Sequence, residues 1–125
     1  MQKKVLVTGA AGFIGSHTCD ELLSRGHQVV GLDNLNDYYP PERKEANIEE
    51  IRGSDKDGNF HFIEGDIRNA ADLDAIIEGG EFDAIVNLAA MAGVRVSIDN
   101  PQLYIDVNLS GTLNLLQSAH KHGVE

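Results

Sequence analysis

The sequence predicts an α/β fold, a Rossmann-like doubly wound parallel sheet, from three observations. Short apolar runs alternate with helix-like stretches along all 125 residues. The first run leads into glycines spaced three apart, Gly9, Gly12 and Gly15, and the second run ends on an acid, Asp33. This order of strand, glycine turn, helix, strand and acid is typical of the start of such a sheet. Four parallel strands are expected, in the order 3-2-1-4: Lys4–Thr8, Gln28–Leu32, Phe60–Glu64 and Phe82–Ala89.

Length and composition limit the functions that the chain can have. It has room for about one domain, and 42% apolar residues are ordinary for a soluble globular protein. The formal net charge is −10, which excludes nucleic acid and anionic membranes as partners. No apolar run approaches the roughly 20 residues that span a bilayer. The single cysteine, Cys19, has no partner for a disulfide within the chain, so we expect a reduced, cytoplasmic setting.

The glycine turn is the first candidate site. Gly9 allows the tight turn, Gly12 lets the backbone approach a bound group, and Gly15 lets the following helix lie against the first strand. Unpaired N–H groups in the first turn of a helix attract anions, so a pyrophosphate at the amides near Phe13 and Ile14 is the expected ligand. A tight turn without a ligand is the alternative.

The acid at the end of the second strand tests the interpretation of the glycines. The intervening helix is expected over Phe13–Arg25 and ends at Gly26. A carboxylate at Asp33 can accept hydrogen bonds from both ribose hydroxyls of an adenosine. A 2′-phosphate there would bring a like charge to about 4 Å, which costs on the order of 4 kcal/mol at an effective dielectric constant near 20. Asn34 and Asn36 supply no cation to offset this, so NAD is favoured over NADP; capping of a loop is the alternative role for the acid.

The segment Asp37–Asn59 interrupts the alternation. Its helix, Glu42–Arg52, follows two prolines and is charged nearly all round, which favours a solvated surface over a binding site. Asp66, after the third strand, lies on the same sheet edge as Asp33, where it could accept a hydrogen bond from an adenine amino group. Asn69 is expected to cap the next helix.

The last third of the chain predicts one loop and one long helix. Ala89 and Ala90 end the fourth strand with small side chains that a ring system could approach. A loop follows over Met91–Ile98, and then a helix that begins at an Asn-Pro pair and ends at Gly123. Asn108 lies in the middle of this helix, where solvent exposure is one of two open expectations.

The histidines do not suggest a metal site. His120 and His122 are two residues apart and therefore point to different sides of a helix. The other three are scattered along the chain, so structural roles are expected for all five.

Five motifs occur in order: Thr8–Ser16, Gly31–Tyr39, Gly65–Arg68, Leu88–Ala90 with Ala92–Arg95, and Asn108–Leu115. Together they resemble the extended short-chain dehydrogenases that epimerise or dehydrate nucleotide sugars. Within that family, Asp33–Tyr39 and Ala92–Arg95 are most similar to the 4-epimerases of UDP-glucuronate. The resemblance covers almost the whole chain.

The resemblance implies an NAD site, a substrate and a reaction. The implied NAD-binding residues are Gly9, Gly12, Phe13, Ile14, Gly15, Asp33, Asn34, Asn36, Asp66, Ile67, Leu88, Ala89, Ala90 and Asn108. Arg95 is placed near the nucleotide-sugar substrate by this analogy, and Asn108 acquires a role in place of solvent exposure. In the implied reaction a tyrosine takes the proton of the sugar 4-hydroxyl, NAD takes the C4 hydride, and the hydride returns to the other face of the keto sugar.

The chain departs from that family in one respect. The catalytic tyrosine and the lysine four residues after it come from beyond the fifth strand in the family, and none of the three tyrosines here has a lysine at that spacing. We therefore expect residues 1–125 to be the amino-terminal part of the NAD-binding domain of a longer, homodimeric enzyme, inactive by itself. The alternatives are part of a nucleotide-sugar 4,6-dehydratase, or a non-catalytic dinucleotide-binding module that associates with itself through the unpaired strand Phe82–Leu88.

Overall fold

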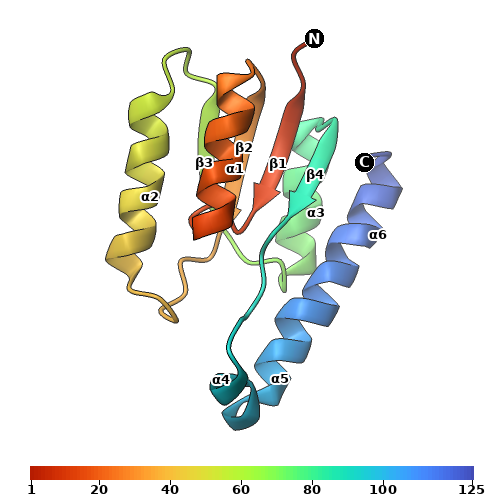
Figure 1. Cartoon of the computed structure of the whole chain (residues 1–125). Helices are drawn as coiled ribbons and strands as arrows, with labels where there is room; N and C mark the ends of the chain where they lie inside the picture. Colours follow the sequence, from red (N-terminus) through yellow and green to blue (C-terminus); the bar gives the residue numbers. More distant parts are fainter.

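The computed structural model of the chain describes residues 1–125, arranged as a parallel sheet with helices on both faces (Figure 1). The elements are β1 (Lys4–Thr8), α1 (Phe13–Ser24), β2 (Gln28–Asp33), α2 (Pro41–Ser54), β3 (Phe60–Glu64), α3 (Ala70–Gly80), β4 (Ala84–Asn87), α4 (Val94–Asp99), α5 (Pro101–Tyr104), the π-helical segment η1 (Ile105–Gly111) and α6 (Thr112–His122). The strand order is β3-β2-β1-β4, which confirms the predicted topology. None of the helices has the length and apolar character that crossing a bilayer requires.

Two apolar cores lie on the two faces of the sheet. The core on the α1 and α2 face contains Val5, Val7, Ala10, Ala11, Cys19, Val29, Ile48 and Ile51. The core on the α3 and α6 face contains Leu6, Val30, Leu32, Ile67, Leu73, Ile77, Phe82, Val107 and Leu115. Val5, Leu6 and Val7 of β1 alternate between these cores, so both faces of the strand are covered and its three central residues are all apolar.

The register brings the carboxyl ends of the strands to one edge of the sheet. Thr8 at the end of β1 pairs with Leu32 on one side and Asn87 on the other. Asp33 at the end of β2 pairs with Glu64 of β3. In Figure 1 the arrows of β1 and β4 point toward the end of the molecule at which α4 and α5 lie, and β2 and β3 run parallel to them. The residues that follow these strands therefore share one edge, where ligands bind in open parallel sheets.

The fourth strand is shorter than predicted, Ala84–Asn87 in place of Phe82–Ala89. Beyond it, the N–H groups of Leu88 and Ala89 donate to the hydroxyl of Thr8, at 3.0 and 3.1 Å. The N–H of Leu88 also donates to the carbonyl oxygen of Thr8, at 3.3 Å, so the backbone ladder continues to Leu88 and only Ala89 is held by the side chain alone. An apolar run cannot reveal such an ending, because the partner is far away in the sequence.

The last third of the chain also differs from the prediction. The expected loop over Met91–Ile98 contains the short helix α4, and the expected single helix is divided into α5, η1 and α6. Gly111, at the end of η1, packs against the loop between β3 and α3. A Cβ on Gly111 would lie 2.6 Å from the side chain of Ile67 in that loop. Gly123 has a φ of +67° and ends α6, as expected.

Candidate functional site

The glycine turn brings β1, α1 and β4 into close contact. Gly9 has a φ of +68°, and a Cβ on it would lie 2.8 Å from the backbone of Leu88. A Cβ on Gly15 would lie 1.9 Å from the carbonyl oxygen of Gly9, so α1 can leave the turn in this direction only with glycine there. A Cβ on Gly12 would meet only that same oxygen, at 3.3 Å, so the space beside Gly12 is otherwise open. The predicted close packing at Gly15 is confirmed, whereas the approach of a ligand to Gly12 stays a prediction.

The amino end of α1 has no side-chain cap. Its N-cap is Gly12, which has no side chain to accept a hydrogen bond, whereas Asn69 caps α3 and Asn100 caps α5. The side chains of Phe13 and Ile14 are exposed. The N–H groups of the first turn of α1 are therefore available to an anion, and the helix dipole favours one there.

A cleft at the carboxyl ends of the strands joins most of the predicted site residues. Those that line it are Gly9, Gly12, Asp33, Asn34, Asn36, Asp66, Ile67, Leu88, Ala89 and Ala90. Those outside its lining are Phe13, Ile14, Gly15, Asn108 and Arg95. Arg95 lies exposed on α4, so its contact with a substrate stays a prediction.

Asp33 is fixed at the edge of this cleft with its carboxylate toward the glycine turn. The side chain is only 8% exposed, and its oxygens accept hydrogen bonds from the N–H groups of Ala11, at 3.0 Å, and Leu35, at 2.8 Å. A carboxylate oxygen has two lone pairs. Each oxygen of Asp33 therefore keeps one lone pair for a ligand, and the backbone holds the group in place.

Lys44 is a residue of the cleft that the sequence analysis missed. The prediction that the charges of its helix form a solvated surface and not a binding site is wrong for Lys44, which is 8% exposed and lines the cleft. Its Nζ lies 3.8 Å from Oδ1 of Asp33 and donates a hydrogen bond to Oδ1 of Asn36, at 3.0 Å. The buried residues Ile48 and Ile51 follow it by four and seven positions, which is the spacing of one helix face. That spacing is the signal that could have identified it.

Asp66 is the second acid at the strand ends, and Arg68 dominates its surroundings. The Nε of Arg68 lies 3.0 Å from both carboxylate oxygens, and this interaction lowers the pKa of Asp66 to about 2. Asn34 donates to the same carboxylate at 3.1 Å and so connects the end of β2 with the end of β3. Acceptance of an adenine amino group by Asp66 stays a prediction.

Asn108 is half-buried and its side chain is hydrogen-bonded within the protein, so of the two open expectations the solvent-facing one is wrong, while its assignment to the NAD site stays a prediction. Its Nδ2 donates to the carbonyl oxygen of Met91 at 3.1 Å, and its Oδ1 accepts from the N–H of Met91 at 2.8 Å. The side-chain amide thus pairs with one backbone residue as a neighbouring strand would. Asn108 lies in η1, the kind of local widening of a helix that is frequent at functional sites. It holds the Leu88–Ala92 segment that lines the cleft, without lining the cleft itself.

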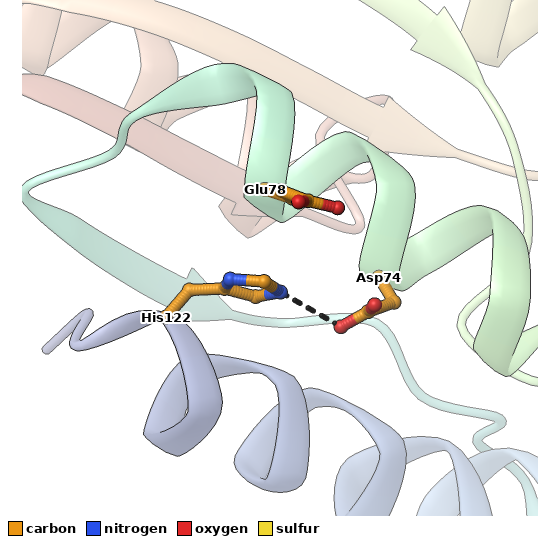
Figure 2. Close-up of side chains that lie close together, drawn as sticks. All are labelled: Asp74, Glu78 and His122. Carbon is orange, nitrogen blue, oxygen red and sulfur yellow. Dashed lines mark hydrogen bonds and ion pairs between the residues drawn. The ribbon is translucent and has the colours of Figure 1, made fainter.

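A second polar cluster joins α3 to α6, and none of its members lines the cleft (Figure 2). Asp74, Glu78 and His122 offer possible ligand atoms that lie within 4.8 Å of one another. The carboxylate of Asp74 already accepts hydrogen bonds from Ser118 at 2.8 Å and Lys121 at 3.1 Å, and lies 2.9 Å from Nε2 of His122. The hydrogen bond from Ser118 contributes most to a pKa of about 2 for Asp74, followed by those from the other two side chains. An ammonium group already neutralises this carboxylate, so the cluster acts as a connection between helices.

The strand order, the glycine turn and the cleft at the strand ends define a domain of the Rossmann type. A model of the GDP-mannose 4,6-dehydratase family matches residues 6–125. The chain belongs to this family.

Known proteins with similar sequences and structures include both epimerases and a dehydratase. The chain is 45% identical to the UDP-glucuronate 4-epimerase of Thermodesulfobacterium geofontis over 120 residues, which is 96% of the chain and 36% of that protein. It is similar to the crystal structure of a UDP-glucose 4-epimerase from Stenotrophomonas maltophila with bound NAD and formylated UDP-arabinopyranose, with a TM-score of 0.84, 36% identity and coverage of 98% of the chain and 35% of the other. DesIV, a dTDP-glucose 4,6-dehydratase from Streptomyces venezuelae crystallised with NAD, gives a TM-score of 0.79 and 37% identity over 96% of the chain and 36% of the other. The chain therefore spans about a third of the length of these relatives.

Proposed function

We propose that this chain is the amino-terminal, NAD-binding part of a nucleotide-sugar 4-epimerase that acts on UDP-glucuronate or UDP-glucose. One observation carries the proposal: Asp33 accepts a hydrogen bond from Ala11, a residue of the glycine turn. This contact brings a ribose-binding acid next to the amino end of α1. An adenosine diphosphate needs that pair of groups side by side.

The residues of the cleft fit NAD. The uncapped first turn of α1 and the open side of Gly12 would receive the diphosphate, and the spare lone pairs of Asp33 would accept the ribose hydroxyls. Ala89 and Ala90 line the same cleft with small side chains. NAD bound here would accept a hydride from the sugar and return it. Asn108 would keep the Leu88–Ala92 wall in place through its two hydrogen bonds to Met91.

The epimerase is favoured over the dehydratase by the identity of the relatives. UDP-glucuronate 4-epimerase from Thermodesulfobacterium geofontis is 45% identical to the chain, and the stretches Asp33–Tyr39 and Ala92–Arg95 most resemble the 4-epimerases of UDP-glucuronate. The solved structures do not separate the two activities, since the UDP-glucose 4-epimerase from Stenotrophomonas maltophila is 36% identical and DesIV is 37% identical. The dehydratase is retained as the second candidate because its fold and NAD are shared with the epimerases. Arg95 would contact the sugar nucleotide in either enzyme, and the catalytic tyrosine and lysine would come from outside these 125 residues.

We propose that the protein's partner is a second copy of itself, in a homodimer. The segment from α5 to α6 exposes the apolar side chains of Ile105, Leu109, Leu113 and Leu116, which are 45–66% exposed. Their spacing of four, four and three residues places them in one stripe. Burial of this stripe against a second copy would remove an apolar surface of the kind that marks interfaces.

Two measurements test the proposal. Isothermal titration calorimetry with NAD as the titrant should show saturable binding at one site per chain. An absence of binding would refute the cofactor assignment. The full-length protein supplied with UDP-glucuronate should form the 4-epimer without net consumption of NAD. If the protein instead converts a nucleotide hexose into a 4-keto-6-deoxy sugar, its activity is that of a dehydratase.

A further inference from the structure

Lys44 is a buried cation whose hydrogen-bonding capacity is largely unused. It is 8% exposed and lines the same cleft as Asp33. An ammonium group has three N–H donors, and the acceptor that the protein places within hydrogen-bond distance is Oδ1 of Asn36, at 3.0 Å. The nearest oxygen of Asp33 lies 3.8 Å away, which is too far for a hydrogen bond. A buried charge with spare donors beside a cleft gains free energy when a ligand oxygen comes within reach.

Asp33 offers the opposite chemistry at the same place. Both of its oxygens keep a lone pair after they accept from Ala11 and Leu35. An acceptor and a donor thus lie 3.8 Å apart on one side of the cleft. A vicinal diol matches such a pair, because each hydroxyl donates one hydrogen bond and accepts others.

We propose that Asp33 and Lys44 bind the adenosine ribose of the cofactor together, and that Lys44 helps to set the choice between NAD and NADP. Asp33 accepts from the ribose hydroxyls and Lys44 donates to them. The inference rests on the proposed function, because it requires a dinucleotide in the cleft. The two charges nearly cancel for a group that lies near both, so Lys44 offsets the repulsion that Asp33 alone would exert on a 2′-phosphate. Removal of one charge or the other should therefore shift the discrimination in opposite directions.

Affinities for NAD and NADP, measured by calorimetry on four forms of the protein, test this proposal. Lys44→Met should weaken NAD about tenfold, since it removes a charge-assisted hydrogen bond. It should weaken NADP about a hundredfold, because the carboxylate then repels the 2′-phosphate without opposition. Asp33→Asn should strengthen NADP about tenfold through the unopposed ammonium. The double variant should lose that gain.

Arg43→Met is the matched control, because Arg43 precedes Lys44 on α2 and is exposed. It changes the net charge equally and should alter neither affinity by more than about twofold. The inference is overturned if Lys44→Met behaves like Arg43→Met, or if the NADP gain of Asp33→Asn survives in the double variant. Wild-type protein that binds neither dinucleotide would overturn the proposed function itself. Should Lys44→Met fail to fold by circular dichroism, Lys44→Gln, which keeps a neutral donor, is held to the same criterion on the ratio of the two affinities.

Discussion

Asp33 and Asp74 are both carboxylates held near a lysine, but they belong to regions of different kinds. Asp33, at the end of β2, lines the cleft, and each of its two oxygens accepts from only one backbone N–H group. Asp74, on α3, accepts hydrogen bonds from Ser118, Lys121 and His122 of α6. Backbone donors hold a carboxylate in place and leave it usable, whereas side-chain donors from a neighbouring helix consume it. Of these two acids, the one held by backbone N–H groups therefore lines the cleft, and the one held by side chains connects two helices.

The same contrast holds for the helices that carry these regions. The N-cap of α1 is Gly12, which lines the cleft and supplies no side-chain cap. The N-cap of α3 is Asn69, whose side chain accepts from the N–H of Asp72. A capped helix end has less to offer an anion than an uncapped one, because one of its free N–H groups is already paired. The strand-end region should thus respond to ligand and the α3–α6 region should not.

A substitution at the tightest point of the strand-end region has the largest expected effect. Gly15→Ala places a Cβ 1.9 Å from the carbonyl oxygen of Gly9, so the backbone has to move. We expect a loss of about 3 kcal/mol or more in the free energy of unfolding, measured by urea denaturation. Gly79→Ala in α3 is the matched control, because a Cβ there meets no atom within 4 Å, and it should be neutral or stabilising. Equal stability of the two variants would contradict the close contact.

Removal of each carboxylate in turn sharpens the comparison. Asp33→Ala should weaken NAD binding about 10- to 100-fold, because it removes charge-assisted hydrogen bonds to the ribose. Asp74→Ala should leave the NAD dissociation constant within about twofold, since Asp74 does not line the cleft. Calorimetry measures both constants, and circular dichroism establishes that each variant is folded. Equal losses in the two variants would remove the distinction between the regions.

Substitution of Asn108 should have a smaller effect on stability, because this residue holds the Leu88–Ala92 segment that lines the cleft. Asn108→Leu keeps the size of the side chain and removes both hydrogen bonds to Met91. The free energy of unfolding should fall by about 1–3 kcal/mol, because backbone groups lose their partners. Ser110→Ala, at an exposed position of the same segment, is the control and should have little effect. Denaturant titrations compare the two variants, and similar midpoints would argue against a positioning role.

The smallest effect is expected from the pH response of Asp74. Its pKa is lowered from 3.8 to about 2 in the folded state, so its stabilising contribution is present above pH 3.8 and is lost as the pH falls toward 2. Asp74→Asn lacks this titration. The stability advantage of the wild type over Asp74→Asn should therefore shrink between about pH 5 and pH 2.5, measured by denaturant titration at each pH. A constant difference over that range would show that the cluster does not stabilise the charged form.

The sheet could be predicted from the sequence because its signals are local. The run Val5–Val7, the glycines after it and the acid at Asp33 lie within one strand–helix–strand unit, and the structure has the predicted strand order. The role of Asn108 could not be predicted from the residues alone, because it depends on a π-helical segment and on a partner 17 residues away. The burial of Lys44 could be predicted in part. Its spacing of four residues from Ile48 indicates the same helix face, but the many charged residues around it made a solvated helix the simpler interpretation.

The central claim is that the cleft at the strand ends, and no other part of the surface, receives the adenosine diphosphate of NAD. A two-dimensional ¹H–¹⁵N NMR titration of the protein with NAD tests it most directly. The claim predicts that the largest shifts fall on the amides of Ala11, Gly12, Phe13 and Leu35, while those around Asp74 remain in place. Shifts centred on the α3–α6 region, or none at saturating NAD, would contradict it.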